Sequence, residues 1–160
     1  EHYSVEPDIV VMGKGMGGGL PVGAFSASSL LMKVLINNPK LGHISTFGGN
    51  PVIAAACLAT LRELRDSKII LQIKKKEALF RKELKHEKIK EIRGKGLMLA
   101  IILKDSETAN KIVLRCMDKG LLLFWLLWEK KAVRISPPLI IKEKEILKGC
   151  AIIREVLDNI

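Results

Sequence analysis

The feature that most constrains this sequence is an apolar segment running directly into a glycine-rich turn that carries one lysine. Val10 to Met12 are apolar, Lys14 follows, and glycines recur through Gly19 before residues 20–24 become apolar again. A continuous apolar run bounded by glycines is typical of a strand covered on both faces of an α/β sheet. The pattern predicts a strand over residues 7–12, with Lys14 at its carboxyl end, where open α/β sheets bind their ligands.

A lysine in this position is a candidate for covalent chemistry. A buried stem and an amine facing a crowded polar cavity disfavour the ammonium form, and such an amine can form an imine with a carbonyl compound. Gly13, Gly15 and Gly18 also match a dinucleotide-binding pattern, which requires a helix at that point and an acidic residue about 20 positions further on. Residues 20–24 predict more strand and residues 33–38 contain no acid, so the nucleotide interpretation is disfavoured.

The remaining pattern predicts an α/β chain with a change of domain within its central helices. Asn50 is a suitable N-cap for a long, largely buried helix that begins at Pro51. Ser106 is a candidate cap for a later helix, and Gly120 a candidate terminator. We expect one domain over residues 1–64 and a second, α+β domain over residues 65–160. The other expected elements are strands at 22–28, 97–103, 121–126 and 132–135, helices at 29–36 and 69–89, and a closing helix around 146–156.

Composition argues against several classes of function. The three cysteines and three histidines are scattered without metal-ligand spacing, so we expect no metal site and interpret the cysteines as reduced core thiols of a cytoplasmic protein. No leader precedes an apolar segment, and the longest apolar run, Leu121 to Trp128, is too short to cross a membrane.

The net charge of +10 raises the question of nucleic-acid binding. The lysines over residues 74–90 alternate with glutamates, and only Phe80 could offer a ring for stacking on a base. A solvated helix face explains this run better than a binding patch does. We therefore expect neither a nucleic-acid nor a membrane partner.

Four sequence blocks occur in one characteristic order: Met12-Gly13-Lys14 with Gly17 to Ala24, Ser45 to Pro51, Arg93 to Leu97, and Arg134 to Leu139. Together they strongly resemble the class III (ornithine/acetylornithine/4-aminobutyrate) aminotransferases, which depend on pyridoxal 5′-phosphate. The resemblance runs along the whole chain but corresponds only to the later part of a family member. It implies a fold-type-I architecture: the end of a large α/β domain, with its linking helix, followed by a small carboxyl-terminal α+β domain.

The resemblance also assigns roles to individual residues. Lys14 matches the lysine that forms a Schiff base with the cofactor and later shuttles a proton, a role suited to an amine that can leave and return as a base. Thr46 matches a residue that hydrogen-bonds the cofactor phosphate of the neighbouring subunit, with Ser45 beside it, which implies a homodimer with a shared active site. Arg134 matches the residue that binds a substrate carboxylate, for which a planar guanidinium is well suited. Arg93 and its neighbouring glycines are interpreted as structural.

The implied reaction transfers an amino group from a small ω-amino donor to 2-oxoglutarate. The family's acid on the pyridine nitrogen, its phosphate-binding loop and its stacking aromatic all correspond to positions before Glu1, so we expect this chain alone to be a poor catalyst. Two alternatives stay open: an enzyme resembling glutamate-1-semialdehyde aminomutase, and a non-catalytic truncated fragment that self-associates.

Overall fold

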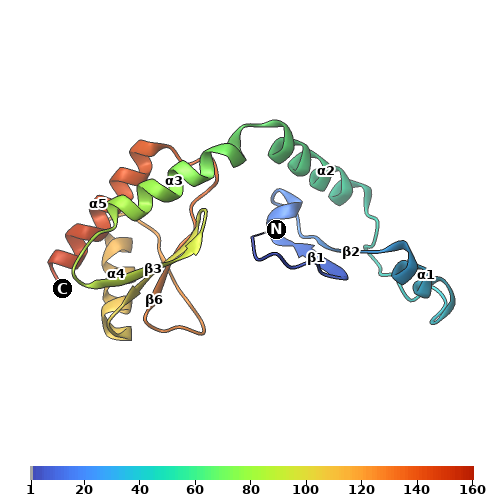
Figure 1. Ribbon diagram of the computed structural model, residues 1–160, viewed down its shortest axis with the longest axis horizontal. Helices are drawn as coiled ribbons and strands as arrows, with labels where there is room; N and C mark the ends of the chain where they lie inside the picture. Colours follow the sequence, from blue (N-terminus) through green and yellow to red (C-terminus); the bar gives the residue numbers. More distant parts are fainter. Residues whose placement is uncertain (1) are drawn as a thin grey trace. The chain divides into compact units, whose positions relative to one another are not determined.

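The structure, a computed structural model, describes residues 2–160 and divides the chain into two compact units. The first unit runs to Ser67, and the second covers Lys68–Ile160 (Figure 1). The mixed α/β content agrees with the predicted fold class. Within the described residues, no helix is both long and apolar enough to span a bilayer.

In the first unit a short hairpin precedes two helices along the chain. Strands β1 and β2 pair antiparallel, in a register that joins Ile9 to Ala27 and Gly13 to Gly23. A single turn of 3-10 helix, η1, directly follows β1, so no α-helix opens there and the dinucleotide pattern lacks its required context. The elements are β1 (Ile9–Gly13), η1 (Lys14–Gly17), β2 (Gly23–Ala27), α1 (Ser29–Asn37) and α2 (Pro51–Asp66).

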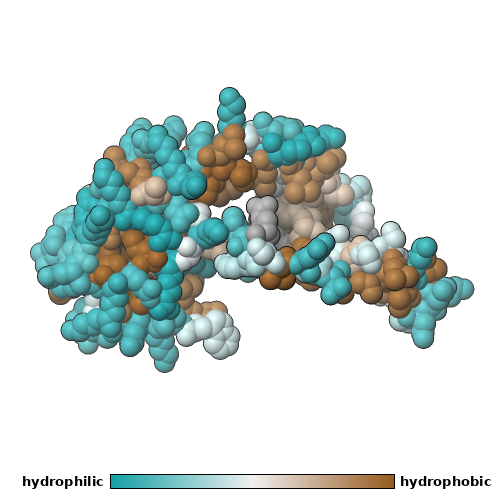
Figure 2. All heavy atoms as spheres, viewed as in Figure 1, coloured by the Kyte–Doolittle hydropathy of each residue, from teal (hydrophilic) through white to brown (hydrophobic). Residues whose placement is uncertain are grey.

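This first unit has almost no core. Of its described residues, only Gly17 and Cys57 are buried, and Val11 in the middle of β1 is 79% exposed. Successive side chains of a strand point to opposite faces, so the exposed side chains of β1 show that both of its faces are open. The predictions of a strand covered on both faces and of a largely buried helix at Pro51 are therefore wrong for this chain. Apolar side chains reach the surface instead (Figure 2).

The second unit is a four-stranded sheet in the order β3-β4-β6-β5, with antiparallel pairing between all neighbours. Strands β4 and β5 therefore run parallel to each other, with β6 between them and helix α4 connecting them along the chain. The elements are α3 (Ile69–Glu83), β3 (Ile89–Lys95), β4 (Met98–Leu103), α4 (Ser106–Asp118), β5 (Phe124–Trp125), β6 (Ala132–Ile135) and α5 (Glu143–Asp158).

The core of this unit lies between one face of the sheet and the helices. Alternate residues of β4 and β6 supply the sheet side, as the two-residue period of a strand requires. Cys116 and Cys150 are fully buried on the helix side, and burial raises the pKa of the Cys116 thiol to about 11 and that of Cys150 to about 12. Both thiols are therefore protonated near neutral pH and packed as small apolar groups, which agrees with the predicted core role.

Three local predictions differ from the structure. Strand β3 was not expected, because its charged outward residues lack a continuous apolar pattern. Strand β5 has two residues rather than the six expected over 121–126. The N-cap of α4 is Asp105 rather than Ser106, since the Asp105 carboxylate accepts a hydrogen bond from the Thr108 amide at 2.7 Å.

Candidate functional site

Lys14 directly follows β1 and opens the turn η1. Its backbone φ is 51°, in the left-handed region where a residue other than glycine costs of order 1–3 kcal/mol. The side chain is exposed in this chain, so the crowded polar cavity predicted around its amine is not formed by residues 2–160. The structure thus places a primary amine at the end of a strand, on a backbone conformation that sequence preference alone would not select.

The glycines after Lys14 let the turn pack closely against helix α2. Gly18 has a φ of 59°, and its amide donates to the Gly15 carbonyl at 3.2 Å. A side chain added at Gly18 would meet the Thr60 hydroxyl oxygen of α2 too closely to be accommodated without movement. Glycine is therefore required here for both the backbone conformation and the close approach of the turn to α2.

The segment from Ser45 to Gly49 forms tight turns that lead into α2. The amide of Gly48 donates to the Ser45 carbonyl at 3.1 Å, and the amide of Asn50 donates to the Phe47 carbonyl at 3.2 Å. The Asn50 side chain accepts from the amides of Val52 and Ile53, which confirms its predicted role as N-cap. Because Asn50 already accepts hydrogen bonds from these two amides, the hydroxyls of Ser45 and Thr46 are not needed to cap the helix.

A groove of about 520 Å³ joins the two motifs of the first unit. Met16 comes from the lysine turn, Ser45 and Phe47 come from the loop before α2, and Cys57 and Leu61 lie on α2. Lys14 and Thr46 are both exposed and are not among the described residues that line this groove. The structure therefore brings the lysine turn and the Ser45 loop to one groove without placing the Lys14 amine inside it.

Arg134 lies in the second unit, on β6. It faces away from the helices, because its strand neighbours Val133 and Ile135 are both in the core. Across the sheet it pairs with Ala100 on one side and with Phe124 on the other. Its Nε is buried and lacks a hydrogen-bond partner among the residues described.

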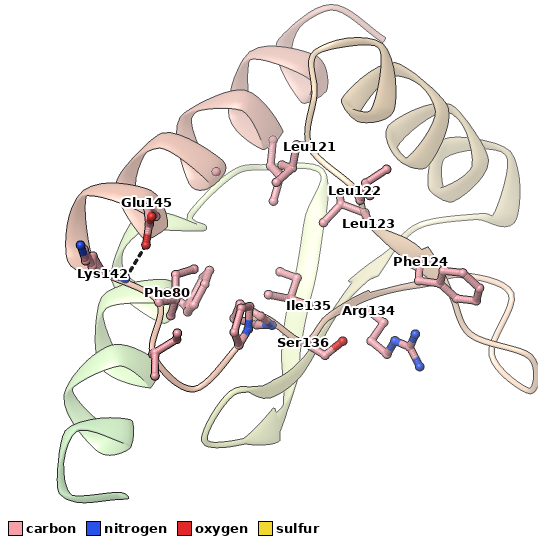
Figure 3. Close-up of a pocket in the computed structure, with 16 residues that line it drawn as sticks. Phe80, Leu121, Leu122, Leu123, Phe124, Arg134, Ile135, Ser136, Lys142 and Glu145 are labelled. Atoms are coloured by element: carbon pink, nitrogen blue, oxygen red, sulfur yellow. Dashed lines mark hydrogen bonds between the residues drawn. The ribbon is translucent and has the colours of Figure 1, made fainter. Parts of the chain in front are cut away.

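A cavity of about 800 Å³ runs beside this arginine (Figure 3). Its walls are mostly apolar and come from residues 121–124, from the end of β6 and most of the segment that follows it up to residue 142, and from helices α3 and α5. Lys76 of α3 ties that segment in place, since its Nζ donates to the Leu139 carbonyl at 2.6 Å. Lys76 is only 7% exposed, so the prediction that the whole lysine run of α3 is a solvated face is wrong at this residue.

Sequence reasoning missed Phe124 and Lys76 as residues of this region. Phe124 lies within a long apolar run that gives no sign of which side chain faces the arginine. Lys76 is the last of three consecutive lysines, and only the helical period distinguishes its position in the sequence from that of Lys75. Lys75, in contrast, forms an exposed ion pair with Glu143.

Comparison with known proteins places this geometry in a family. The family model described as aminotransferase class-III matches residues 1–157. The chain is 41% identical to the acetylornithine aminotransferase of Caldanaerobacter subterraneus, over 100% of this chain and 40% of that protein. The chain thus spans about 40% of the length of this curated relative.

Solved structures show the same relationship. The acetylornithine aminotransferase of Elizabethkingia anophelis superimposes with a TM-score of 0.85 at 35% identity, covering 99% of this chain and 41% of that one. The ornithine aminotransferase of Plasmodium yoelii superimposes with a TM-score of 0.84 at 30% identity, covering 99% of this chain and 42% of that one. On the match of its sequence and of its fold, the chain belongs to the class-III aminotransferase family.

Proposed function

We propose that this chain is the carboxyl-terminal part of a pyridoxal-phosphate-dependent aminotransferase. The complete protein transfers an amino group from an ω-amino donor to 2-oxoglutarate. Family membership supports the reaction class, and relatives named acetylornithine and ornithine aminotransferase support the donor class. In this proposal residues 1–64 belong to the large cofactor-binding domain and its linking helix, and residues 65–160 form the small domain.

The donor chemistry of the first unit fits pyridoxal phosphate. The cofactor needs a primary amine for its aldehyde and hydrogen-bond donors for its phosphate. Lys14 offers an exposed amine, and Ser45 and Thr46 offer two hydroxyls just before the amino-terminal end of α2, whose dipole favours an anion. These residues fit the group, with the hydroxyls rather than the capped amides of Val52 and Ile53 as phosphate donors.

Each of these side chains has a distinct task in the proposed reaction. When bound, the cofactor supplies an electron sink for the bonds at the substrate carbon. The Lys14 Nζ would hold the cofactor, and the same amine, when free, would serve as a base at the substrate carbon. Ser45 and Thr46 hold the phosphate, and the Arg134 guanidinium binds a substrate carboxylate. Among residues 2–160 no carboxylate forms an ion pair with Arg134, and this supports the last role, because the terminal nitrogens of its guanidinium are left for an anionic ligand.

We also propose that the complete protein is a homodimer in which each active site draws residues from both subunits. The open faces of β1 and the exposed apolar residues of the first unit support this, since a surface of that kind is stable in water only when something covers it. The cover is the remainder of the polypeptide together with a second subunit.

The observation that carries the proposal is Lys14 at the end of β1, in a left-handed backbone conformation, within a chain matched by the family model over residues 1–157. The test is amino transfer to 2-oxoglutarate by the complete protein, with ornithine, acetylornithine and 4-aminobutyrate as donors. Lys14→Ala should lower kcat by about 10²- to 10⁴-fold, the usual contribution of a positioned acid–base group. The control Lys33→Ala removes an exposed lysine of α1 and should leave kcat unchanged. Full activity in the Lys14 variant would remove the proposal.

A further inference from the structure

The position of Arg134 is unusual, because none of the described residues forms an ion pair with its guanidinium. No ion pair or hydrogen bond joins it to another residue within the range 2–160, and its Nε is buried. A buried donor without a partner costs free energy, and such groups are rare in folded proteins. Some other feature of the structure must therefore stabilise the guanidinium in this position.

Phe124 gives the guanidinium an attractive contact, although not a hydrogen bond for Nε. Strand pairing places Phe124 directly opposite Arg134 on the same face of the sheet, and the centre of the guanidinium lies 4.8 Å from the centroid of the Phe124 ring. Figure 3 shows the two side chains projecting to the same side from neighbouring strands. A cation over an aromatic face is attracted by the negative potential of the ring, and a ring with two torsions loses little entropy in holding it.

The Phe124 ring has a second aromatic contact, although both rings are partly exposed. Trp125, the next residue on β5, packs edge-on against it, with ring centroids 6.1 Å apart and planes at 68°. Edge-to-face packing of this kind is a favoured arrangement of aromatic pairs. The orientation of Phe124 therefore does not depend on the arginine alone.

The opposite side of Arg134 is more open. Its other cross-strand neighbour is Ala100, whose single methyl group is the smallest side chain that β4 could offer there other than hydrogen. Cross-strand neighbours on one face lie about 4.5–5.5 Å apart. Phe124 covers one side of Arg134, and the small Ala100 leaves the other side less crowded. Beyond Ala100 on the same face lies Arg93, whose guanidinium is already paired with Glu91. A ligand oxygen is therefore excluded on the Phe124 side and approaches Arg134 over Ala100.

We propose that Phe124 is a positioning residue for Arg134, and that it orients the guanidinium so that a ligand carboxylate binds on the side of Ala100. The inference rests on the proposed function in one respect, that Arg134 binds a carboxylate. Because Nε is buried, the two terminal nitrogens are the groups that meet the carboxylate, in the paired geometry that a guanidinium favours.

The first test is a direct readout of the contact. In NMR spectra of the 160-residue chain, the Arg134 Nε–H signal is assigned as the one lost in Arg134→Lys. A ring stacked on the guanidinium should shift this signal upfield and slow its exchange with water. Phe124→Leu should abolish both effects and Phe124→Tyr should keep them. The control Trp128→Leu removes a ring from the same hairpin that is 98% exposed and should change neither. A signal unaffected by Phe124→Leu overturns the proposal.

The second test measures binding of glutarate, used as a dicarboxylate probe, by titration of the same chain. Phe124→Leu should raise the Kd roughly 2- to 5-fold, as expected for loss of a partly exposed cation–π contact, and Phe124→Tyr should restore it. In an Arg134→Gln background the further change Phe124→Leu should have no effect, because a positioning residue acts only through its partner. A merely structural role for Phe124 would weaken binding equally in both backgrounds.

The outcomes separate the two proposals. If Arg134→Gln weakens glutarate binding and Phe124→Leu does not, only the positioning role is wrong. If Arg134→Gln leaves the Kd unchanged, or if glutarate shifts no signal of Arg134, the carboxylate role of Arg134 is wrong, and the positioning role fails with it.

Discussion

At the scale of single residues, backbone conformation explains sequence features that composition does not. Lys14 and Gly94 both have positive φ, of 51° and 105°. Lys14 adopts a left-handed backbone conformation that its side chain disfavours. At Gly94 the backbone conformation is one that only glycine can adopt. The first is therefore a functional candidate, and the second is a structural requirement of the β3–β4 hairpin, in agreement with the structural role expected for this motif.

Gly94 provides a prediction about stability. A side chain there would collide with the backbone carbonyl of Met98, in addition to the unfavourable φ. Gly94→Ala should lower the free energy of unfolding by about 3 kcal/mol, since the backbone conformation alone costs of order 1–3 kcal/mol. Urea unfolding followed by tryptophan fluorescence measures this, because both tryptophans, Trp125 and Trp128, lie in the second unit.

The matched control is Gly120→Ala. Gly120 also has a positive φ, of 77°, but a side chain there meets nothing within 4 Å. This variant should lose only about 1 kcal/mol, the cost of the left-handed conformation. Equal losses at the two glycines would mean that the clash with Met98 is absorbed by movement of the hairpin.

At the scale of elements, one helix is attached to one hairpin by a shared pair of side chains. Glu77 of α3 accepts hydrogen bonds from the Gly96 amide at 2.7 Å and from Arg81 Nε at 2.9 Å. Arg81 in turn donates to the carbonyls of Ile92 and Gly94, at 2.7 and 2.8 Å. This glutamate–arginine pair therefore connects α3 to strand β3 and to Gly96 in the β3–β4 turn.

Glu77→Gln should destabilise the second unit by about 2 kcal/mol, because hydrogen bonds to a charged group contribute about 1.5–3 kcal/mol. The matched control is Glu107→Gln on α4. Glu107 also pairs with a cation four residues on, Lys111, but its side chain is 77% exposed compared with 20% for Glu77. The control should cost about 0.5 kcal/mol or less. Similar losses in the two variants would contradict the proposed attachment.

The Glu77–Arg81 pair should make the stability of the second unit depend on pH. Burial pushes the pKa of Glu77 upward, but the Gly96 amide and Arg81 outweigh it and leave the pKa below the ordinary value of 4.5. The stability contributed by Glu77 is therefore present above about pH 4.5 and is lost as the pH falls through the lowered pKa of the folded state. The difference in unfolding free energy between wild type and Glu77→Gln should shrink below pH 4.5.

How far the sequence predicts this fold depends on the element. Helices with clear ends were predictable, since Asn50 caps α2 and Gly120 follows α4 with positive φ, as expected. Strand β3 was not predictable from periodicity, because Arg93 and its charged neighbours face solvent at a sheet edge. For the site, Lys14, Ser45, Thr46 and Arg134 stay predictions that come from motif resemblance. Phe124 could be found only from strand register, which a sequence does not state.

At the scale of the whole molecule, the two units differ in how much they can stabilise themselves. The second has a core shared by a sheet and three helices, whereas Cys57 is the only buried side chain of the first among the residues described. Stability that depends on burying apolar surface is therefore concentrated in the second unit.

Amide hydrogen exchange of the 160-residue chain should show this difference. Amides of β4, β6, α4 and α5 should be protected up to the free energy of global unfolding, while those of β1 and β2 should exchange close to the rate of unstructured peptides. The proposed function adds that the β1 and β2 amides become protected in the complete protein, where further chain and a second subunit would cover them. Strong protection of β1 in the 160-residue chain would contradict the conclusion that it lacks cover.

The central claim is that the Lys14 amine binds pyridoxal phosphate covalently. The most direct measurement is borohydride reduction of the complete protein after incubation with pyridoxal phosphate, followed by peptide mapping by mass spectrometry. The reduced cofactor should be found on the peptide that contains Lys14, and Lys14→Ala should abolish this label while Lys33→Ala retains it. Stoichiometric label on another lysine, with Lys14 unmodified, would contradict it.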